Sequence, residues 1–311
     1  MKKNSITIKA YAKLNLILQI VGKRADGYHL LNSFMQSIDL YDTITVKKKK
    51  TLNSQIIIKT EYSKKLLPYI TDEFNAPEDV EKNICGKVAK KIMSINNIKN
   101  DIEIKIFKRI PIGAGLGGGS SDGAAAANAI NELFDLNHTK QQLCNIVKDI
   151  GADIPFNIYC GSAIVQGIGE KIKLIDAEFL KDYKFILIYP NIHSSTVEVY
   201  RNFKKRLTDT ADYVKLLLKN NKNDIESYLV NDLSETVYCL YGKIKIVKEK
   251  IENSINKKIF MSGSGSTLFL IFNDAQLMNK TYKLLVKKLS DCLILKTAPL
   301  IKKYKGEFYE D

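Results

Sequence analysis

Cysteine and histidine are scarce in this sequence, and both are dispersed. The 311 residues include five cysteines and three histidines, and no two cysteines form a CxxC pair. An odd number of scattered cysteines is typical of reduced thiols in a cytoplasm rather than of a disulfide framework. Zinc sites are built from clustered cysteine and histidine, so the sequence predicts no metal site held by side chains. A Cys–His catalytic pair stays open, although the pattern disfavours it.

Long apolar runs are also absent. No run approaches the roughly 18 residues that a membrane span requires. The N-terminal MKKNSITIKAYAKLNL passes almost directly into alternating polar and apolar residues. It lacks the apolar core and the small-residue cleavage site of a signal peptide. We therefore expect a cytoplasmic protein with no membrane partner.

Acidic residues are fewer than basic ones. Lys and Arg together number 48 and Asp and Glu 34, which gives a net charge of +14. Such a balance raises the hypothesis of nucleic-acid binding, because clustered Lys and Arg supply most phosphate affinity. Here the lysines are spread along the chain, and even the run at residues 47–50 follows a strand-like segment and is interpreted as a solvated strand end. We predict no nucleic-acid partner, whereas a small polyanionic substrate would benefit from the same field.

The length predicts two domains, because 311 residues exceed what one hydrophobic core usually supports. We place the boundary after residue 160, with an N-terminal domain at 1–160 and a C-terminal domain at 161–311. Strand patterns occur at residues 6–20, twice within 35–60, and at 102–106, 184–190 and 292–297, and a small-residue loop runs into a strand within residues 259–272. Helical patterns occur at residues 83–95, 124–134, 139–150, 210–255 and 274–289. These lack the regular βαβ rhythm of a doubly wound sheet, so the predicted class is α+β.

A glycine-rich stretch, RIPIGAGLGGGSSDGAAAA at residues 109–127, lies between a predicted strand and a predicted helix. A flexible linker would have polar, turn-rich flanks, whereas strand, glycine loop and helix is an arrangement in which backbone amides converge on an anion. Glycine permits positive φ and removes every Cβ that would obstruct a phosphate. Ser120 and Ser121 stand where a helix N-cap is expected. The stretch therefore predicts an anion-binding loop.

Two common nucleotide loops do not fit this stretch. A Walker P-loop needs a lysine after its last glycine, and none follows here. A GxGxxG pattern occurs at residues 113–118, but a dinucleotide fingerprint belongs to a βαβ unit. In this sequence the following helix leads to another helix.

That further helix is predicted from a capping box, Thr139-Lys-Gln-Gln142. We interpret Gly151 as the left-handed residue that ends the helix, which places Asp153 just beyond a helix C-terminus and before Pro155. The negative end of the helix dipole would tend to raise the pKa of Asp153, a nearby ammonium would act in the opposite direction, and the sequence does not give the net pKa.

The glycine stretch resembles the central motif of the GHMP small-molecule kinases, named for galactokinase, homoserine, mevalonate and phosphomevalonate kinases. FMSGSGSTLFLIF resembles the family's third motif, a second glycine loop that folds beside the first. AYAKLNLILQIVGKRADGYHLLNSFMQSIDLYDTI and GADIPFNIYCGSAIVQGIGEKI are similar to members that phosphorylate an alcohol linked to cytidine diphosphate. The resemblance implies a two-domain α+β fold, with an ATP-binding N-terminal domain like ribosomal protein S5 and a ferredoxin-like C-terminal domain.

The resemblance also assigns the reaction and its catalytic residues. Asp153 matches the aspartate that removes the proton from the acceptor hydroxyl, and Lys13 matches the lysine paired with it. Without the family, Lys13 would be an ordinary strand residue and Asp153 a turn former. ATP and Mg²⁺ are the implied cofactors. The residues implied to hold ATP are Asn83, Pro111, Gly113, Ala114, Gly115, Leu116, Gly117, Gly118, Gly119, Ser120 and Ser121.

The acceptor site is implied by residues in two further segments. Tyr28 matches a tyrosine that stacks on the cytosine, and His29 matches a histidine that hydrogen-bonds it. Tyr200 aligns with an aromatic residue on the other face of the base, and Asn15 matches an asparagine lining the pocket. Stacking on an aromatic face contributes about 1–3 kcal/mol per base. The alternative is a GHMP kinase for homoserine or mevalonate, for which a base-stacking tyrosine serves no purpose. We expect a monomer or a weak homodimer.

Overall fold

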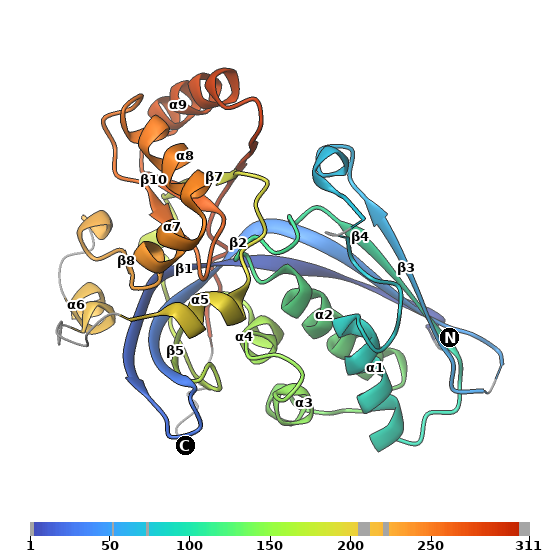
Figure 1. Ribbon diagram of the computed structural model, residues 1–311. Coiled ribbons are helices and arrows are strands. Elements are labelled where there is room, and N and C mark those ends of the chain that lie inside the picture. Colours follow the sequence, from blue (N-terminus) through green and yellow to red (C-terminus); the bar gives the residue numbers. More distant parts are fainter. Residues whose placement is uncertain (1–2, 52, 73–74, 205–211, 220–223, 305–311) are drawn as a thin grey trace. The chain divides into compact units, whose positions relative to one another are not determined.

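The computed structural model describes residues 3–51, 53–72, 75–204, 212–219 and 224–304. The chain forms two compact units. Unit 1 comprises Met1–Ala12, Leu40–Ile112 and Gly117–Cys160, and unit 2 comprises Lys13–Asp39, Gly113–Leu116 and Gly161–Asp311. Two long strands, β1 (Ser5–Lys23) and β2 (His29–Lys48), supply residues to both units (Figure 1). The predicted domains at 1–160 and 161–311 stay a prediction.

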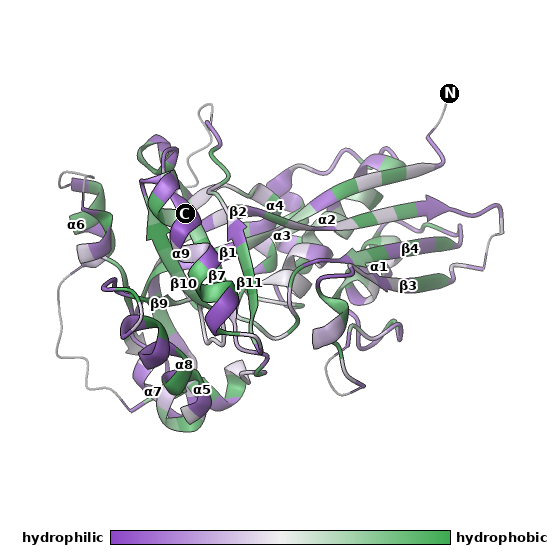
Figure 2. Cartoon of the chain, turned by 90° about the horizontal axis from the view of Figure 1, so that it is seen from above, coloured by the Kyte–Doolittle hydropathy of each residue, from purple (hydrophilic) through white to green (hydrophobic). Residues whose placement is uncertain are grey.

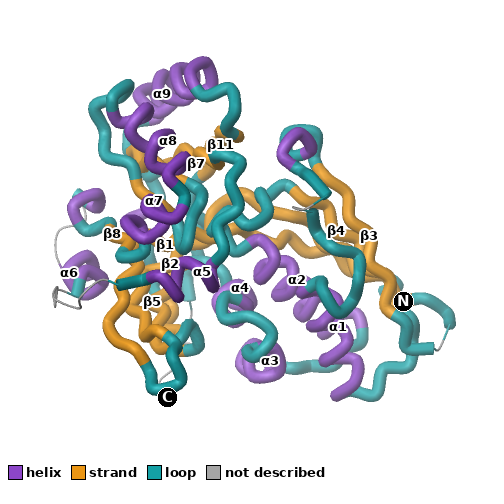
Figure 3. The backbone as a smooth tube through the Cα atoms, in the orientation of Figure 1, coloured by secondary structure: helices purple, strands orange, loops and turns teal. Residues whose placement is uncertain are grey.

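Unit 1 contains a sheet whose apolar residues alternate as the sequence predicts. Strand β3 (Ile56–Tyr62) runs parallel to β4 (Ile102–Lys108), and β4 is antiparallel to the second half of β2. Ile104 lies opposite Val46 and Ile106 opposite Ile44, and all four side chains are buried. Helices α1 and α2 lie along one side of β3 and β4 (Figure 3).

Four helices complete unit 1: α1 (Ile84–Ile95), α2 (Gly118–Leu133), α3 (Lys140–Val147) and α4 (Ile154–Tyr159). The capping box is confirmed, because the side chains of Thr139 and Gln142 each accept a hydrogen bond from the other residue's backbone. Small residues allow α2 to pack closely on α1. A Cβ on Gly123 would lie 2.6 Å from a methyl of Ile84, so only glycine fits there.

Unit 2 contains a four-stranded antiparallel sheet in the order β11-β7-β10-β9. Its strands are β7 (Lys184–Tyr189), β9 (Phe260–Met261), β10 (Leu268–Phe272) and β11 (Leu293–Thr297). Strand β10 is buried along its whole length, which explains its uninterrupted apolar sequence LFLIF (Figure 2). Helices α7 (Ser234–Leu240), α8 (Gly242–Glu252) and α9 (Ala275–Lys288) contribute to the same apolar core as β7 and β10.

The remaining elements of unit 2 are short. Strand β5 (Ser162–Gly167) pairs with β2 and with β6 (Lys171–Leu174), and β8 (Val230–Asn231) pairs in parallel with β1. Unit 2 also contains helices α5 (Thr196–Asn202) and α6 (Tyr213–Lys219) and 3-10 turns at Glu178–Leu180 and Ile225–Ser227. Unit 1 has a similar 3-10 turn at Leu67–Tyr69. The predicted α+β class is confirmed. Within the described ranges, none of the helices has the length and apolar character of a membrane span.

Candidate active site

The glycine loop begins as predicted, but helix α2 starts earlier than expected. Gly113, Gly115 and Gly117 have φ angles of +63°, +73° and +67°, a conformation that glycine adopts without a Cβ penalty. Gly118 and Gly119 are instead the first residues of α2, and Gly117 is its N-cap. The expectation that Ser120 or Ser121 caps the helix is therefore wrong, because left-handed Gly117 allows the helix to begin three residues earlier.

This early start adds helical amides to the loop. The first N–H groups of an α-helix have no partner within the helix and carry its positive dipole end. In α2 these groups belong to residues without bulky side chains, from Gly118 to Ser120. The Ser121 hydroxyl donates a hydrogen bond to the Tyr11 carbonyl at 2.7 Å, which attaches the first turn of α2 to β1 within unit 1. The helix start is thus suited to an anion.

A second glycine loop, residues 262–266 between β9 and β10, contacts the first loop within unit 2. The Ser262 hydroxyl donates to the Gly115 carbonyl at 3.0 Å, and the Thr267 N–H donates to the Ala114 carbonyl at 3.1 Å. A Cβ on Gly115 would lie 2.4 Å from the Ser262 carbonyl oxygen and 2.6 Å from that of Gly265. The sequence-based prediction that the two loops lie side by side is confirmed for residues 113–116.

Lys13 and Asn15 lie beside the second loop. The Lys13 ammonium donates to Asn15 Oδ1 at 2.5 Å, and Asn15 Nδ2 donates to the Ser33 hydroxyl at 2.9 Å. A Cβ on Gly263 would lie 3.3 Å from both Lys13 Nζ and Asn15 Oδ1. Both side chains are buried, so the cation is held close to the backbone of the second loop.

Asp153 lies at the start of a helix rather than beyond the end of one. Helix α3 ends at Val147, Gly151 is absent from the glycines with positive φ, and Asp153 is the N-cap of α4. The dipole argument drawn from the sequence is therefore wrong. Because α3 ends at Val147 and a further helix begins at Ile154, Asp153 lies at the positive end of a helix dipole rather than at the negative end. A Cβ on Gly151 would lie 3.7 Å from the Ser120 hydroxyl, so this turn lies near the first turn of α2.

Two of the aromatic residues predicted to hold a base meet in unit 2. The rings of His29 and Tyr200 have centroids 5.5 Å apart, and Phe203 meets His29 edge-on at 5.6 Å. Tyr28 is 60% exposed, which leaves its ring face accessible. Burial, together with the charge of Lys23, lowers the pKa of His29, which favours the neutral imidazole. Sequence reasoning missed Phe203, whose only signal was an aromatic residue three positions after Tyr200.

Asn83 and Pro111 have structural surroundings of their own. Asn83 caps α1: its side chain accepts from the Cys85 N–H at 2.8 Å and donates to the Pro77 carbonyl at 2.6 Å. Pro111 is buried just before the glycine loop. These contacts account for both residues without a ligand, so their contact with ATP stays a prediction.

The cysteines are free, as the sequence predicts. Burial raises the pKa of Cys144 to about 12 and that of Cys292 to about 11, and it also raises the pKa of Cys85. A thiol that resists ionisation is a poor nucleophile. Across the described ranges, no three His, Cys, Asp or Glu side chains come together in a way that could hold a metal ion.

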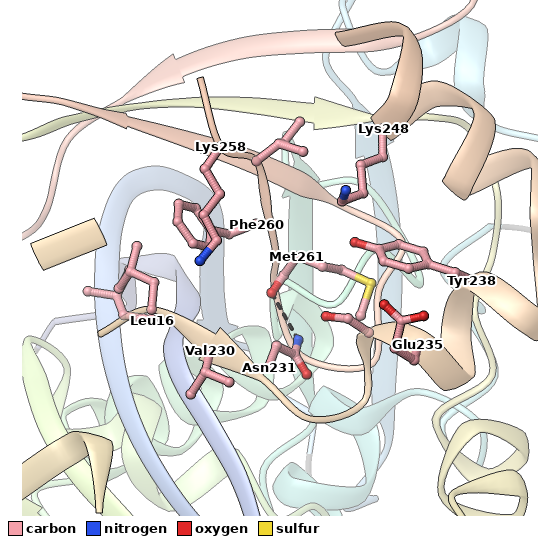
Figure 4. Close-up of a pocket in the computed structure, with 12 residues that line it drawn as sticks. Leu16, Val230, Asn231, Glu235, Tyr238, Lys248, Lys258, Phe260 and Met261 are labelled. Atoms are coloured by element: carbon pink, nitrogen blue, oxygen red, sulfur yellow. Dashed lines mark hydrogen bonds between the residues drawn. The ribbon is translucent and has the colours of Figure 1, made fainter. Parts of the chain in front are cut away.

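A cavity of about 200 Å³ in unit 2 is lined in part by Phe260 and Met261 of β9, the strand that leads into the second glycine loop (Figure 4). It is lined by residues of β1, β8, β9, α7 and α8 and by Lys258, and none of the predicted site residues lines it. Asn231, on its wall, donates to the carbonyls of Met261 and Gly263 at 2.9 and 2.8 Å. The cavity wall therefore supports the second loop, whereas the predicted site residues lie elsewhere.

Sequence reasoning also missed a buried charge cluster in unit 1. Lys108, the last residue of β4, pairs with Asp42 of β2 and with Asp122 of α2. A signal was present, because Asp122 is the one acidic residue in the glycine- and alanine-rich stretch.

The comparisons with known proteins agree with this geometry. Residues 83–161 match the model of the GHMP kinases N terminal domain. The chain is similar to the 4-diphosphocytidyl-2-C-methyl-D-erythritol kinase of Clostridium botulinum, with 37% identity over 93% of this chain and 99% of the relative. The corresponding kinase of Acetivibrio thermocellus is 34% identical over 94% of this chain and 99% of its own length.

Solved structures support the same fold. The crystal structure of a 4-(cytidine 5'-diphospho)-2C-methyl-D-erythritol kinase matches 94% of this chain and 99% of its own, with a TM-score of 0.73 at 22% identity. The homoserine kinase of Cytophaga hutchinsonii matches 97% of this chain and 96% of its own, with a TM-score of 0.68 at 16% identity. From the sequence relatives and the shared fold, the chain belongs to the 4-diphosphocytidyl-2-C-methyl-D-erythritol kinase family of GHMP kinases.

Proposed function

We propose that this chain transfers the γ-phosphoryl group of ATP to the 2-hydroxyl of 4-diphosphocytidyl-2-C-methyl-D-erythritol, a step in the non-mevalonate route to isoprenoid precursors. The observation that carries the proposal is the contact between the two glycine loops in unit 2, with the Lys13 ammonium beside them. Backbone amides and a buried cation at one place suit a polyphosphate better than any other common ligand.

The chemistry of phosphoryl transfer needs positioning and neutralisation of charge more than covalent participation by the protein. Asp153 accepts the proton of the acceptor hydroxyl, whose oxygen forms a bond to the γ-phosphorus as the bond to ADP breaks. Lys13 stabilises the negative charge near the acceptor oxygen, and Asn15 orients Lys13 through the hydrogen bond to its ammonium. When bound, Mg²⁺ would neutralise charge on the phosphates.

Mg²⁺ would need few ligands from the residues of this protein. Magnesium in kinases is held largely by phosphate oxygens and water and needs few protein ligands. Among the described residues, no three His, Cys, Asp or Glu side chains form a group that could hold a metal ion. Residues 117–120 and their helical amides would hold the phosphates.

The acceptor would be recognised by aromatic stacking. Tyr28 and Tyr200 hold the two faces of the cytosine, and His29 in its neutral form offers one donor and one acceptor to the edge of the base. Phe203 packs edge-on against His29 and keeps the imidazole in place. Homoserine and mevalonate would leave these rings without a partner, which favours the cytidine-linked acceptor. We also propose that the protein is cytoplasmic and a monomer or weak homodimer.

The test of the acceptor is a panel of alcohols. Purified protein is supplied with ATP, Mg²⁺ and, in turn, the cytidylylated methylerythritol, homoserine or mevalonate, and ADP release is followed. We expect turnover with the first and none with the others. Turnover on homoserine or mevalonate without turnover on the cytidylylated alcohol would contradict the proposal.

The test of the base is the substitution Asp153→Asn. The amide keeps the shape of the carboxylate but accepts no proton, so we expect kcat to fall by about 10²–10⁴. Both substrates should still bind, which calorimetry can measure. A variant that keeps wild-type turnover would remove Asp153 from this role.

A further inference from the structure

A cluster of three charged side chains lies inside unit 1, close to the start of α2. Lys108 is 4% exposed, Asp42 0% and Asp122 6%. The Lys108 ammonium donates to Asp122 Oδ2 at 2.7 Å and to Asp42 Oδ2. Removing three ionisable groups from water is unfavourable, and apolar residues of similar size often give equal or greater stability. Stability alone therefore does not explain why these three residues are buried here.

One end of the glycine loop is held by Asp42. Its Oδ1 accepts the N–H of Ile110 at 2.9 Å and that of Arg109. These are the first residues after β4, so the carboxylate determines the direction in which the chain leaves the sheet. The Arg109 guanidinium also donates to the Thr43 hydroxyl at 2.8 Å, which attaches the same turn to the neighbouring residue of β2.

The other end of the loop rests on Lys108. A Cβ on Gly118 would lie 3.5 Å from Lys108 Nζ and 3.0 Å from a methyl of Ile110. Gly118 is the first residue of α2, so the ammonium lies under the helix start whose amides face the proposed phosphate site. Asp122, one turn further along α2, accepts from the same ammonium.

The protonation expected for Asp42, Lys108 and Asp122 leaves the cluster without net charge beneath the start of α2. Burial raises the pKa of Asp122 well above its usual range, the charge of Asp42 raises it further, and Lys108 opposes both. Asp122 Oδ1 is buried and has no hydrogen-bond partner within the described part of the chain. A neutral carboxyl tolerates that position better than an ionised one. One ammonium, one carboxylate and one carboxyl carry no net charge.

We propose that Asp42, Lys108 and Asp122 are positioning residues for nucleotide binding: the Lys108 ammonium ties the residues that leave β4 to the first turn of α2 and so sets the backbone amides that receive the phosphates. This rests on the proposed use of ATP by the glycine loop. None of the three side chains touches the reacting atoms in this account. Their effect is on the shape of the loop.

The experiment compares Lys108→Met with Ile104→Ala. Ile104 is fully buried in the same strand but makes none of the contacts described for the loop, so it serves as the matched control for lost packing. ATP affinity is measured by calorimetry, which needs no acceptor, and thermal unfolding is measured for each variant. For Lys108→Met we expect ATP affinity and the KM for ATP to weaken about tenfold to a hundredfold, because a small misplacement of positioned groups has effects of this size. The KM for the acceptor should stay within about twofold of wild type.

If Lys108→Met does not fold, two less disruptive substitutions of Asp122 still test the proposal. Asp122→Asn retains an oxygen that can accept from Lys108, whereas Asp122→Ala removes it. We expect the asparagine variant to bind ATP as wild type does and the alanine variant to bind it more weakly. If Lys108→Met or Asp122→Ala loses thermal stability as Ile104→Ala does but keeps wild-type ATP affinity, the cluster is structural only and the proposal fails. If the protein turned over none of the alcohols in the acceptor panel, calorimetry of ATP binding would still test the role of this cluster.

Discussion

At the scale of single residues, the site depends on side chains whose neighbours determine their state. Lys13 and Asn15 are two positions apart on β1 and would face the same side of any strand. Their hydrogen bond and the further bond from Asn15 to Ser33 fix the ammonium in one orientation. The surroundings of His29 likewise lower its pKa, which favours the neutral imidazole. Residue identity alone would predict neither property.

A prediction at this scale concerns Asp122 and pH. Its pKa is raised on folding, so between its unfolded value near 4 and its raised folded value the native state binds more protons than the unfolded state. The contribution of Asp122 to stability is therefore fully present below pH 4 and is lost as the pH rises through the folded pKa. Relative to Asp122→Asn, the wild type should lose stability as the pH rises above about 4.

The measurement is the urea midpoint of both proteins at several pH values, compared as a difference so that other titrating groups cancel. A difference that stays constant from pH 5 to pH 8 would show that Asp122 is ionised in the native state throughout.

At the scale of elements, the glycine loop illustrates how two segments far apart in sequence share one backbone surface. Residues 113–116 and 262–266 touch through carbonyl and hydroxyl groups, and the absence of side chains permits this approach. The position of α2 follows from Gly117, whose left-handed conformation ends the loop and begins the helix. The shape of the first glycine loop and the start of α2 thus both depend on the conformation of Gly117.

The substitution Gly115→Ala tests this feature. Gly115 has φ of +73°, and a Cβ would lie 2.4 Å from the Ser262 carbonyl oxygen, so the two loops would have to separate. We expect ATP affinity to fall by about tenfold or more, since displacing positioned groups by about 1 Å has effects of that order. The readout is calorimetric titration with ATP.

Gly242→Ala is the matched control. Gly242 begins α8, and a Cβ there would meet nothing within 4 Å. Replacing a helical glycine by alanine stabilises by about 0.5–1 kcal/mol, so this variant should bind ATP as wild type does and unfold at a slightly higher temperature. Equal loss of affinity in both variants would contradict the account of the loop.

At the scale of the whole molecule, the net charge of +14 favours anions without identifying one. Small substrates carrying several phosphates gain from such a field, and so would a nucleic acid. Small polyphosphate substrates and nucleic acids differ in the number of phosphates that the protein neutralises at the same time.

Salt dependence distinguishes these ligands. Nucleic-acid binding that uses several phosphate contacts falls by about a thousandfold between about 50 and about 200 mM salt. We expect any binding of a labelled oligonucleotide, measured by anisotropy, to disappear over this range, while ADP release continues with a KM for ATP that rises less than about tenfold. Oligonucleotide binding that stays tight at the higher salt would contradict the prediction of no nucleic-acid partner.

The sequence by itself determined those features that depend on local chemistry. Glycines at 113, 115 and 117–119 predicted a loop with positive φ, which is confirmed at 113, 115 and 117 and wrong at 118 and 119, where α2 has begun. Thr139 and Gln142 predicted a capping box, and alternation at Ile102, Ile104 and Ile106 predicted a buried strand. Each of these depends on one residue's backbone preference or on neighbours within a few positions. The motif resemblance identified the family for the same reason, because its glycines and charged residues lie in short contiguous blocks.

Tertiary structure decided where α4 begins and which distant side chains meet. Sequence reasoning placed Asp153 beyond a helix end, whereas the structure makes it the N-cap of α4, because helix termini depend on packing that local propensity does not contain. The contact of Phe203 with His29 and the cluster of Asp42, Lys108 and Asp122 join residues that are far apart in the chain. The buried cluster exists only once folding has excluded water, since burial is what changes the protonation of Asp122.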